Sequence, residues 1–129
     1  RLVSVAGASA FLDRAFVTYS DQAKVEELGV SEATLRAHGA VSEETAREMA
    51  RGALAAARAD LAIAITGIAG PTGGSADKPV GLVCFALDGV LGQRTVRRVF
   101  PSADRERTIQ QASNAALEIL RRALVGFEG

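Results

Sequence analysis

The chain has 129 residues, of which 48% are hydrophobic and 5% aromatic, so we expect one core built mainly from Ala, Val, Leu and Ile. Fifteen basic and fifteen acidic residues leave no net charge, which argues against direct binding to nucleic acid or to an anionic membrane surface. No apolar stretch reaches the roughly 20 residues that cross a bilayer, and the single cysteine, Cys84, cannot form an internal disulfide. These features predict a soluble, cytoplasmic protein.

The first predicted elements are a strand and a short helix. Residues 14–19 are β-branched and aromatic, which is typical of a strand. Ser20 is a good N-cap, Asp21 suits the first turn of a helix, and an apolar stripe precedes Gly29. We therefore expect a helix that begins at about Asp21 and ends before Gly29.

Two further helices are expected to begin at serine N-caps. Ser31 predicts a short helix that ends near His38, and Ser42 predicts a long one that ends near Arg58. The long helix is rich in alanine, so it can pack closely on a sheet while its charged residues face water.

Three strands are expected between the long helix and the last helix. Residues 61–66 form a continuous apolar run of strand length, as expected for a central strand covered on both faces. A glycine-rich loop follows. Residues 80–87 predict another buried strand, Asp88-Gly89 a turn, and residues 93–100 an alternating strand, so we expect the last two strands to form a hairpin.

The last predicted element is a long amphipathic helix over residues 104–125, where apolar residues recur close to every 3.6 positions. The sequence has no internal repeat and no linker that would divide it. The order of elements predicts an α/β fold, a single-domain layered α/β sandwich with a mixed sheet flanked by helices, over residues 1–129. The alanine-rich helix and the hairpin offer surfaces on which a homo-oligomer could form.

The first candidate reactive group consists of Tyr19, Ser20 and Lys24. Tyr19 is the last residue of the expected strand, and Ser20 and Lys24 are four residues apart, so they lie on one face of the expected helix. A partly desolvated lysine beside a hydroxyl can take its proton, as in serine–lysine hydrolases. The alternative is that Ser20 is only an N-cap and Lys24 a solvated surface charge.

A second candidate is the glycine-rich loop over residues 66–74, which leaves the carboxyl end of a predicted strand, where α/β sheets commonly bind ligands. Its backbone N–H groups could face an anion. The loop matches neither the phosphate-loop pattern nor the dinucleotide fingerprint. The alternative is a flexible connection without a ligand.

Two further residues have weaker signals. Arg105, at the start of the last helix, could place its guanidinium toward a phosphate or carboxylate, or could simply be solvated. His38 is expected to have a structural role at a helix C-terminus. The sequence lacks the Cys and His spacing of a zinc site and the pattern of a calcium loop, so we expect chemistry without a metal or other cofactor.

Five separated motifs, in order and spanning essentially the whole chain, resemble the C-terminal domain of the CinA family, which is also the stand-alone bacterial nicotinamide-nucleotide amidase. They are Gly7-Ala8-Ser9-Ala10-Phe11, residues 16–24, His38-Gly39-Ala40-Val41-Ser42, residues 66–71 and Lys78-Pro79-Val80-Gly81. The resemblance implies hydrolysis of the carboxamide of nicotinamide mononucleotide to nicotinate mononucleotide and ammonia, a step of pyridine-nucleotide salvage, with no cofactor, no nucleic-acid partner and no membrane.

The resemblance also implies residue roles. Lys24 would be the general base, Tyr19 a hydroxyl that orients groups or relays protons, and Arg105 a contact to the phosphate of the nucleotide. The remaining expected substrate contacts lie near these residues and along the loop: Ser20, Thr66, Gly67, Ile68, Ala69 and Gly70.

In two places the chain departs from the family. The family's nucleophilic serine lies in an Ala-Glu-Ser-Cys-Thr-Gly-Gly segment upstream of the position that matches Arg1, so we expect the nucleophile to lie outside these 129 residues. Relatives also tend to carry an arginine where this chain has Ile109, which implies fewer phosphate contacts. The alternative function is a non-catalytic nucleotide-binding or interaction module linked to competence and the DNA-damage response.

Overall fold

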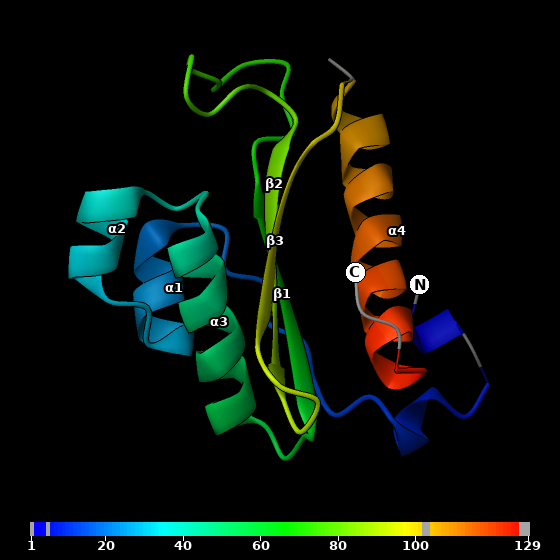
Figure 1. The fold of residues 1–129 in the computed structure, drawn as a ribbon. Coiled ribbons are helices and arrows are strands. Elements are labelled where there is room, and N and C mark those ends of the chain that lie inside the picture. Colours follow the sequence, from blue (N-terminus) through cyan, green and yellow to red (C-terminus); the bar gives the residue numbers. More distant parts are fainter. Residues whose placement is uncertain (1, 5, 102–103, 127–129) are drawn as a thin grey trace.

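The computed structural model describes residues 2–4, 6–101 and 104–126. Within these residues the elements are two short 3-10 helices, four α-helices and three strands (Figure 1). In chain order they are η1 (Leu2–Ser4), η2 (Ala8–Ala10), α1 (Asp21–Leu28), α2 (Glu32–His38), α3 (Glu43–Ala56), β1 (Leu61–Gly67), β2 (Leu82–Gly89), β3 (Arg94–Val99) and α4 (Arg105–Leu124).

The described strands form one sheet in the order β1-β2-β3. Both pairs are antiparallel, and Phe85 lies opposite Ile65 on one side and Val96 on the other. The prediction of a mixed sheet was therefore wrong. A parallel pair needs a crossover connection, usually a helix, whereas β1 reaches β2 through a loop and β2 reaches β3 through a short turn.

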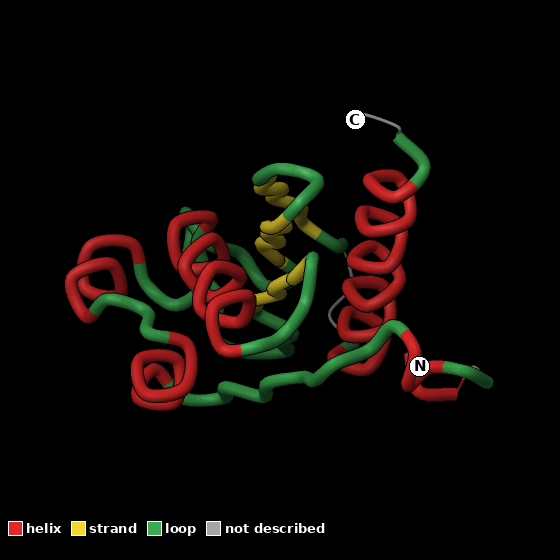
Figure 2. The backbone as a smooth tube through the Cα atoms, turned by 90° about the horizontal axis from the view of Figure 1, so that it is seen from below, coloured by secondary structure: helices red, strands yellow, loops and turns green. Residues whose placement is uncertain are grey.

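Helices cover both faces of this sheet, which gives the predicted layered α/β arrangement (Figure 1). The helix α3 packs on one face, with α1 and α2 on its outer side, and α4 packs on the other face, an arrangement that the view along the strands also shows (Figure 2). The α3 face buries mainly small side chains such as Ala46 and Ala50, and the α4 face buries Phe85 against Ala116 and Ile119. The alanines allow close approach between helix and sheet.

The strand expected at residues 14–19 is absent. Residues 12–19 are extended chain that pairs with no other described strand. Val17 is 89% exposed and Tyr19 84% exposed, and β propensity stabilises a strand only where neighbours supply hydrogen bonds and burial. The strand β1 was expected at the centre of the sheet, but among the described strands only β2 pairs with it, so it lies at an edge and Ile65 is 40% exposed.

The predicted helix starts were confirmed at four N-caps. The side chains of Ser20, Ser31, Ser42 and Asp104 each accept hydrogen bonds from backbone N–H groups in the first turn of the helix that follows. The helix α3 ends at Ala56 rather than near Arg58, because the backbone turns to an extended conformation at Ala57. None of the described helices is both long and apolar enough to cross a membrane.

The predicted hairpin is present, but its turn is displaced. Asp88 and Gly89 are the last residues of β2, and residues 90–93 make the connection to β3. The strand β2 begins at Leu82, two residues later than expected, because the chain bends at Gly81. Gly81 has φ +93° and lies so close to Phe100 that a Cβ would be 2.0 Å from the Phe100 carbonyl oxygen.

Cys84 occupies the centre of β2 and is 1% exposed. Burial raises the pKa of its thiol, and the nearby Glu43 carboxylate adds to this effect. Because the reactive species is the thiolate, we expect iodoacetamide at pH 8 to label Cys84 at least about 100-fold more slowly in the folded protein than in urea. The exposed control Gln93→Cys should react quickly in both, and equal rates for Cys84 in the two conditions would contradict its burial.

Candidate functional site

The carboxyl end of β1 and the amino ends of α1, α3 and α4 lie at the same end of the molecule (Figure 1). The loop over residues 68–81 also lies there. Helix amino ends carry partial positive charge, so this end of the molecule is suited to an anionic ligand. All of the predicted site residues lie at this end.

Arg105, in the first turn of α4, connects two of the predicted regions. Its Nη1 donates a hydrogen bond to the carbonyl oxygen of Gly70 at 3.2 Å, and its Nη2 lies 3.5 Å from the hydroxyl oxygen of Tyr19. The guanidinium thus lies between the glycine-rich loop and the start of α1, while Arg105 remains exposed to solvent. Tyr19 itself remains open to solvent.

Lys24 is buried, with 6% of its surface exposed, although it belongs to a short surface helix. Its Nζ donates to the carbonyl oxygen of Thr18 at 2.8 Å. The alternative of a solvated charge is therefore wrong for Lys24. A buried ammonium loses hydration, which its neighbours must replace, and this is an unusual environment for a lysine.

Ser20 is the N-cap of α1, as the alternative interpretation predicted. Its Oγ accepts a hydrogen bond from the backbone N–H of Ala23 at 3.0 Å and so caps α1. The backbone N–H of Lys24 donates to the carbonyl oxygen of Ser20 at 3.2 Å as part of the helix, but within the described residues no hydrogen bond joins the Lys24 ammonium to the side chain of Ser20 or Tyr19. Tyr19, Ser20 and Lys24 therefore lie at one corner without forming a nucleophile–base pair among themselves.

The end of β1 is held by its own side chain. Thr66 is 7% exposed, and its hydroxyl donates to the carbonyl oxygen of Ala40 at 2.8 Å. Gly67 follows without a side chain, and a Cβ there would lie 2.9 Å from a methyl group of Val83. Next along the loop, Ile68 and Ala69 are half-buried and Gly70 is buried, with a cis peptide bond between Gly70 and Pro71.

His38 is the last residue of α2, as expected for a structural role. Its Nδ1 lies 3.7 Å from a carboxylate oxygen of Glu44, and its carbonyl oxygen accepts a hydrogen bond from Nζ of Lys78. The sequence interpretation assigned no role to Lys78. The available signal was that His38 and Lys78 both belong to motifs on which the family resemblance rests.

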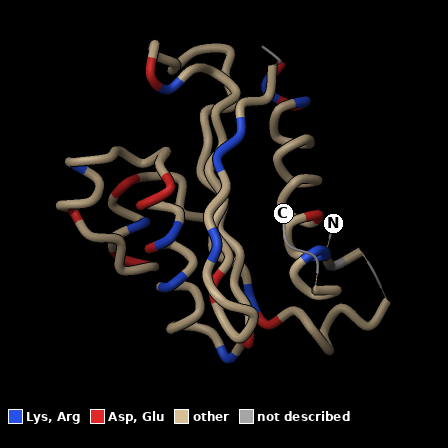
Figure 3. Tube along the Cα trace, viewed as in Figure 1, with Lys and Arg blue, Asp and Glu red and all other residues tan. Residues whose placement is uncertain are grey.

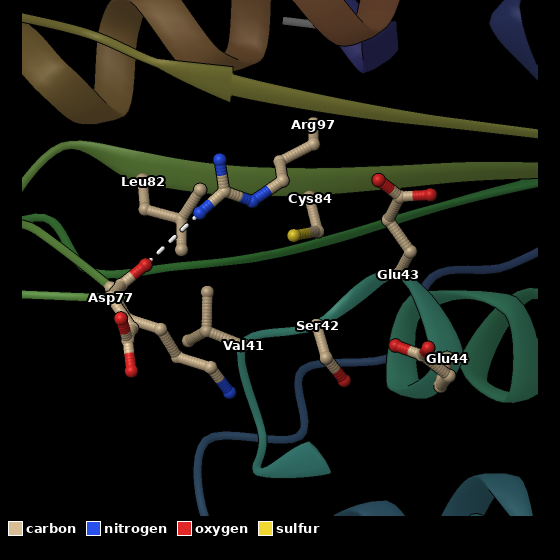
Figure 4. A pocket seen from close by; sticks show the side chains of 9 residues that line it. Val41, Ser42, Glu43, Glu44, Asp77, Leu82, Cys84 and Arg97 are labelled. Atoms are coloured by element: carbon tan, nitrogen blue, oxygen red, sulfur yellow. Dashed lines mark hydrogen bonds between the residues drawn. The ribbon is translucent and has the colours of Figure 1, made fainter.

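A cleft of about 290 Å³ opens beside this turn on the α3 face of the sheet (Figure 4). It was not foreseen, because its charged side chains come from three separate elements. Arg97 enters from β3, a strand rich in basic residues (Figure 3), and Glu43 and Glu44 enter from the first turn of α3. The other lining residues are Val41, Ser42, Asp77, Lys78, Leu82 and Cys84.

Within the described residues, no group of three or more His, Cys, Asp or Glu side chains is arranged to hold a metal ion. The side chains at the end of β1 and at the starts of α1 and α4 are the hydroxyl of Thr66, the phenol of Tyr19, the ammonium of Lys24 and the guanidinium of Arg105. Such a set can bind an anionic ligand and move protons.

Comparison with known families and proteins gives consistent matches. A profile described as "CinA C-terminal domain" matches residues 1–124. A "CinA-like protein" of Syntrophobacter fumaroxidans is 54% identical over 124 residues, which are 96% of this chain and 29% of that protein. "Nicotinamide-nucleotide amidohydrolase PncC" of Escherichia coli K12 is 52% identical over 119 residues, 92% of this chain and 72% of that protein.

Solved structures are similar over nearly the whole chain. The crystal structure of competence/damage inducible protein CihA from Agrobacterium tumefaciens has a TM-score of 0.91 at 45% identity and covers 94% of this chain. This chain in turn covers 74% of CihA. A CinA superfamily protein from Escherichia coli has a TM-score of 0.88 at 40% identity, with coverages of 94% and 70%.

Proposed function

The chain belongs to the CinA C-terminal domain family, and we propose that it carries the substrate-binding and proton-transfer residues of an enzyme that deamidates nicotinamide mononucleotide. The reaction consumes water and converts the carboxamide into a carboxylate, with release of ammonia. The proposal covers the activity of the whole protein, since the chain spans only 29% of the Syntrophobacter relative and 72% of the Escherichia relative.

The observation that carries the proposal is the buried Lys24 at the corner where Tyr19 and Arg105 meet. Lys24 as a whole residue is 6% exposed, and its ammonium donates a hydrogen bond to the Thr18 carbonyl oxygen. A lysine removed from water is suited to exchange protons with a reacting group, and the exposed Tyr19 directly follows Thr18, whose carbonyl oxygen accepts the lysine's hydrogen bond. The identity of 52% to the Escherichia amidohydrolase supports the choice of a carboxamide as that group.

In the proposed mechanism, Lys24 acts as the neutral amine: it takes the proton of the attacking serine hydroxyl, which the family carries upstream of this chain, and passes that proton to the amide nitrogen as ammonia leaves. Water then hydrolyses the resulting ester of the serine, which releases the carboxylate and regenerates the hydroxyl. Tyr19 orients the reacting groups. The Thr66–Gly67 peptide, at the end of β1, lies where backbone N–H groups could stabilise the oxyanion of the tetrahedral intermediate. Arg105 exchanges its contact with the Gly70 carbonyl for the phosphate of the nucleotide, to which a guanidinium binds more strongly because the bond joins opposite charges.

The test is ammonia release from nicotinamide mononucleotide, measured with the 129-residue chain and with a longer chain that adds the serine segment of the family at its amino end. We expect release from the longer chain alone. Nicotinamide riboside, which lacks the phosphate, is the matched substrate and should be turned over less efficiently, because it offers nothing to Arg105.

The other outcomes have distinct meanings. Release from both chains would place the nucleophile within these 129 residues and direct the next substitution to Ser20. Release from neither chain would overturn the amidase proposal and favour the nucleotide-binding or interaction module. Calorimetric titration of the same nucleotide would then separate binding without turnover from no binding.

A further inference from the structure

The loop over residues 68–81 borders the proposed nucleotide site, and cationic side chains hold it at three points. Arg105 of α4 donates to the carbonyl oxygen of Gly70 at 3.2 Å. Arg97 of β3 donates to the carbonyl oxygen of Asp77 at 3.1 Å. Lys78, in the loop itself, donates to the carbonyl oxygen of His38 at the end of α2.

The Lys78 contact spans 40 residues of sequence and joins the loop to the turn over residues 38–42. Space for it is provided by Gly39, where a Cβ would lie 2.9 Å from the Lys78 Nζ. Gly39 also has φ +78°, a conformation that favours glycine. Gly39 is therefore required mainly by its backbone conformation and also leaves room for the lysine ammonium, which relates two of the family motifs.

Three successive carbonyl groups of this turn accept hydrogen bonds from side chains of three different elements. The His38 oxygen accepts from Lys78 of the loop, and the Gly39 oxygen accepts from Thr45 of α3 at 2.7 Å. The Ala40 oxygen accepts from Thr66 at the end of β1 at 2.8 Å. Lys78 and Thr66 thus hold neighbouring carbonyl groups of one turn, and the position of the loop is connected to that of the site.

The loop has few other attachments near Lys78. Within the described residues, Ser75 and Lys78 bond to each other, and Arg97 reaches Asp77 across the cleft (Figure 4). Residues 71–77 are exposed. An exposed segment with few hydrogen bonds has a low cost of local opening, so removal of one anchor is expected to affect this segment before the rest of the fold.

We propose that Lys78 is a positioning residue for the nucleotide site: its bond to the His38 carbonyl fixes the loop over residues 68–81 against the turn over residues 38–42. The proposal rests on the proposed function for its kinetic part. Lys78 touches no reacting atom and acts through the loop, so its loss weakens nucleotide binding and leaves the chemical step largely intact.

The structural test is hydrogen–deuterium exchange of the longer chain with Lys78→Met, which keeps the apolar stem and removes the donor. We expect exchange at the hydrogen-bonded amides of these two segments, Ser75 and Lys78 in the loop and Gly39 in the turn, to rise at least about tenfold, with exchange in β1, β2 and α3 unchanged. Lys78→Arg keeps a cationic donor and should restore slow exchange. The control Arg98→Ala removes an exposed cation from β3 and should change neither segment.

The kinetic test uses the same three variants. We expect Lys78→Met to raise KM for nicotinamide mononucleotide about tenfold while kcat changes less than about threefold, and Lys78→Arg to recover most of the affinity. Exchange that rises equally throughout the protein, or that does not rise in the two segments, would overturn the positioning role. If the wild-type protein releases no ammonia, the proposed function fails, whereas the exchange result still decides on the contact between loop and turn.

Discussion

Replacement of Lys24 by methionine is expected to lower kcat for ammonia release about 10³-fold, measured in the longer chain that carries the serine segment. The methionine fills the same buried position, which is 6% exposed in the wild type, with a side chain that cannot bind a proton. The substitution removes the proton transfer that we propose for Lys24, and kcat falls for that reason. Far-ultraviolet circular dichroism and the urea midpoint should remain close to those of the wild type.

The matched control is Glu27→Gln, which removes one charge from the exposed surface of the same helix. It should leave kcat and KM unchanged within about a factor of two, because exposed charges on a helix contribute little. If Lys24→Met retains kcat and only its KM rises, Lys24 binds substrate and is not the base. If it retains both, the proposed role of Lys24 is wrong.

Gly52→Ala is expected to destabilise the protein by about 3 kcal/mol, although alanine is the better helix former by about 1 kcal/mol. Gly52 lies in α3 where the end of α1 packs against it, and a Cβ there would be 1.7 Å from the Leu28 carbonyl oxygen and 2.6 Å from the Leu28 carbonyl carbon. Both Leu28 atoms belong to the backbone and cannot rotate away, so α1 must shift. Urea denaturation of the 129-residue chain measures the effect.

Ala55→Gly provides the comparison, because Ala55 is exposed in the same helix. Its expected cost is about 1 kcal/mol, from helix propensity alone. The two substitutions exchange the same pair of residue types in opposite directions, and both should destabilise. A Gly52→Ala variant that is more stable than the wild type would show that α1 does not pack closely on α3.

Elements defined by neighbouring residues were predicted well from the sequence. Ser20, Ser31 and Ser42 were expected to begin helices, and each side chain accepts a hydrogen bond from the first turn of its helix. The hairpin of β2 and β3 followed from a buried apolar run and an alternating run close behind it, although its turn lies after Gly89 rather than at Asp88-Gly89. Cys84 was expected in the core and lies there. These features depend on interactions within a few residues, for which the local sequence is sufficient.

Strand pairing was predicted less well. Residues 14–19 have the composition of a strand, but no described strand pairs with them, and β1 has a partner on one side only. The apolar character of a segment does not specify which strand lies beside it or in which direction. Pairing depends on where the rest of the chain places the neighbour. In this sheet the loop over residues 68–81 returns the chain to the same end of β1 without a crossover helix, and a short turn joins β2 to β3, so both pairs are antiparallel.

The candidate site shows the same division between local and distant interactions. The sequence by itself determined which residue types could do chemistry and, through five motifs, the family to which the chain belongs. Only the tertiary structure decided that Lys24 is buried and that Arg105 meets Tyr19 across 86 residues of sequence. It alone placed Lys78 against the His38 carbonyl. Contacts between distant residues depend on how helices pack on the sheet, and no local pattern encodes that packing.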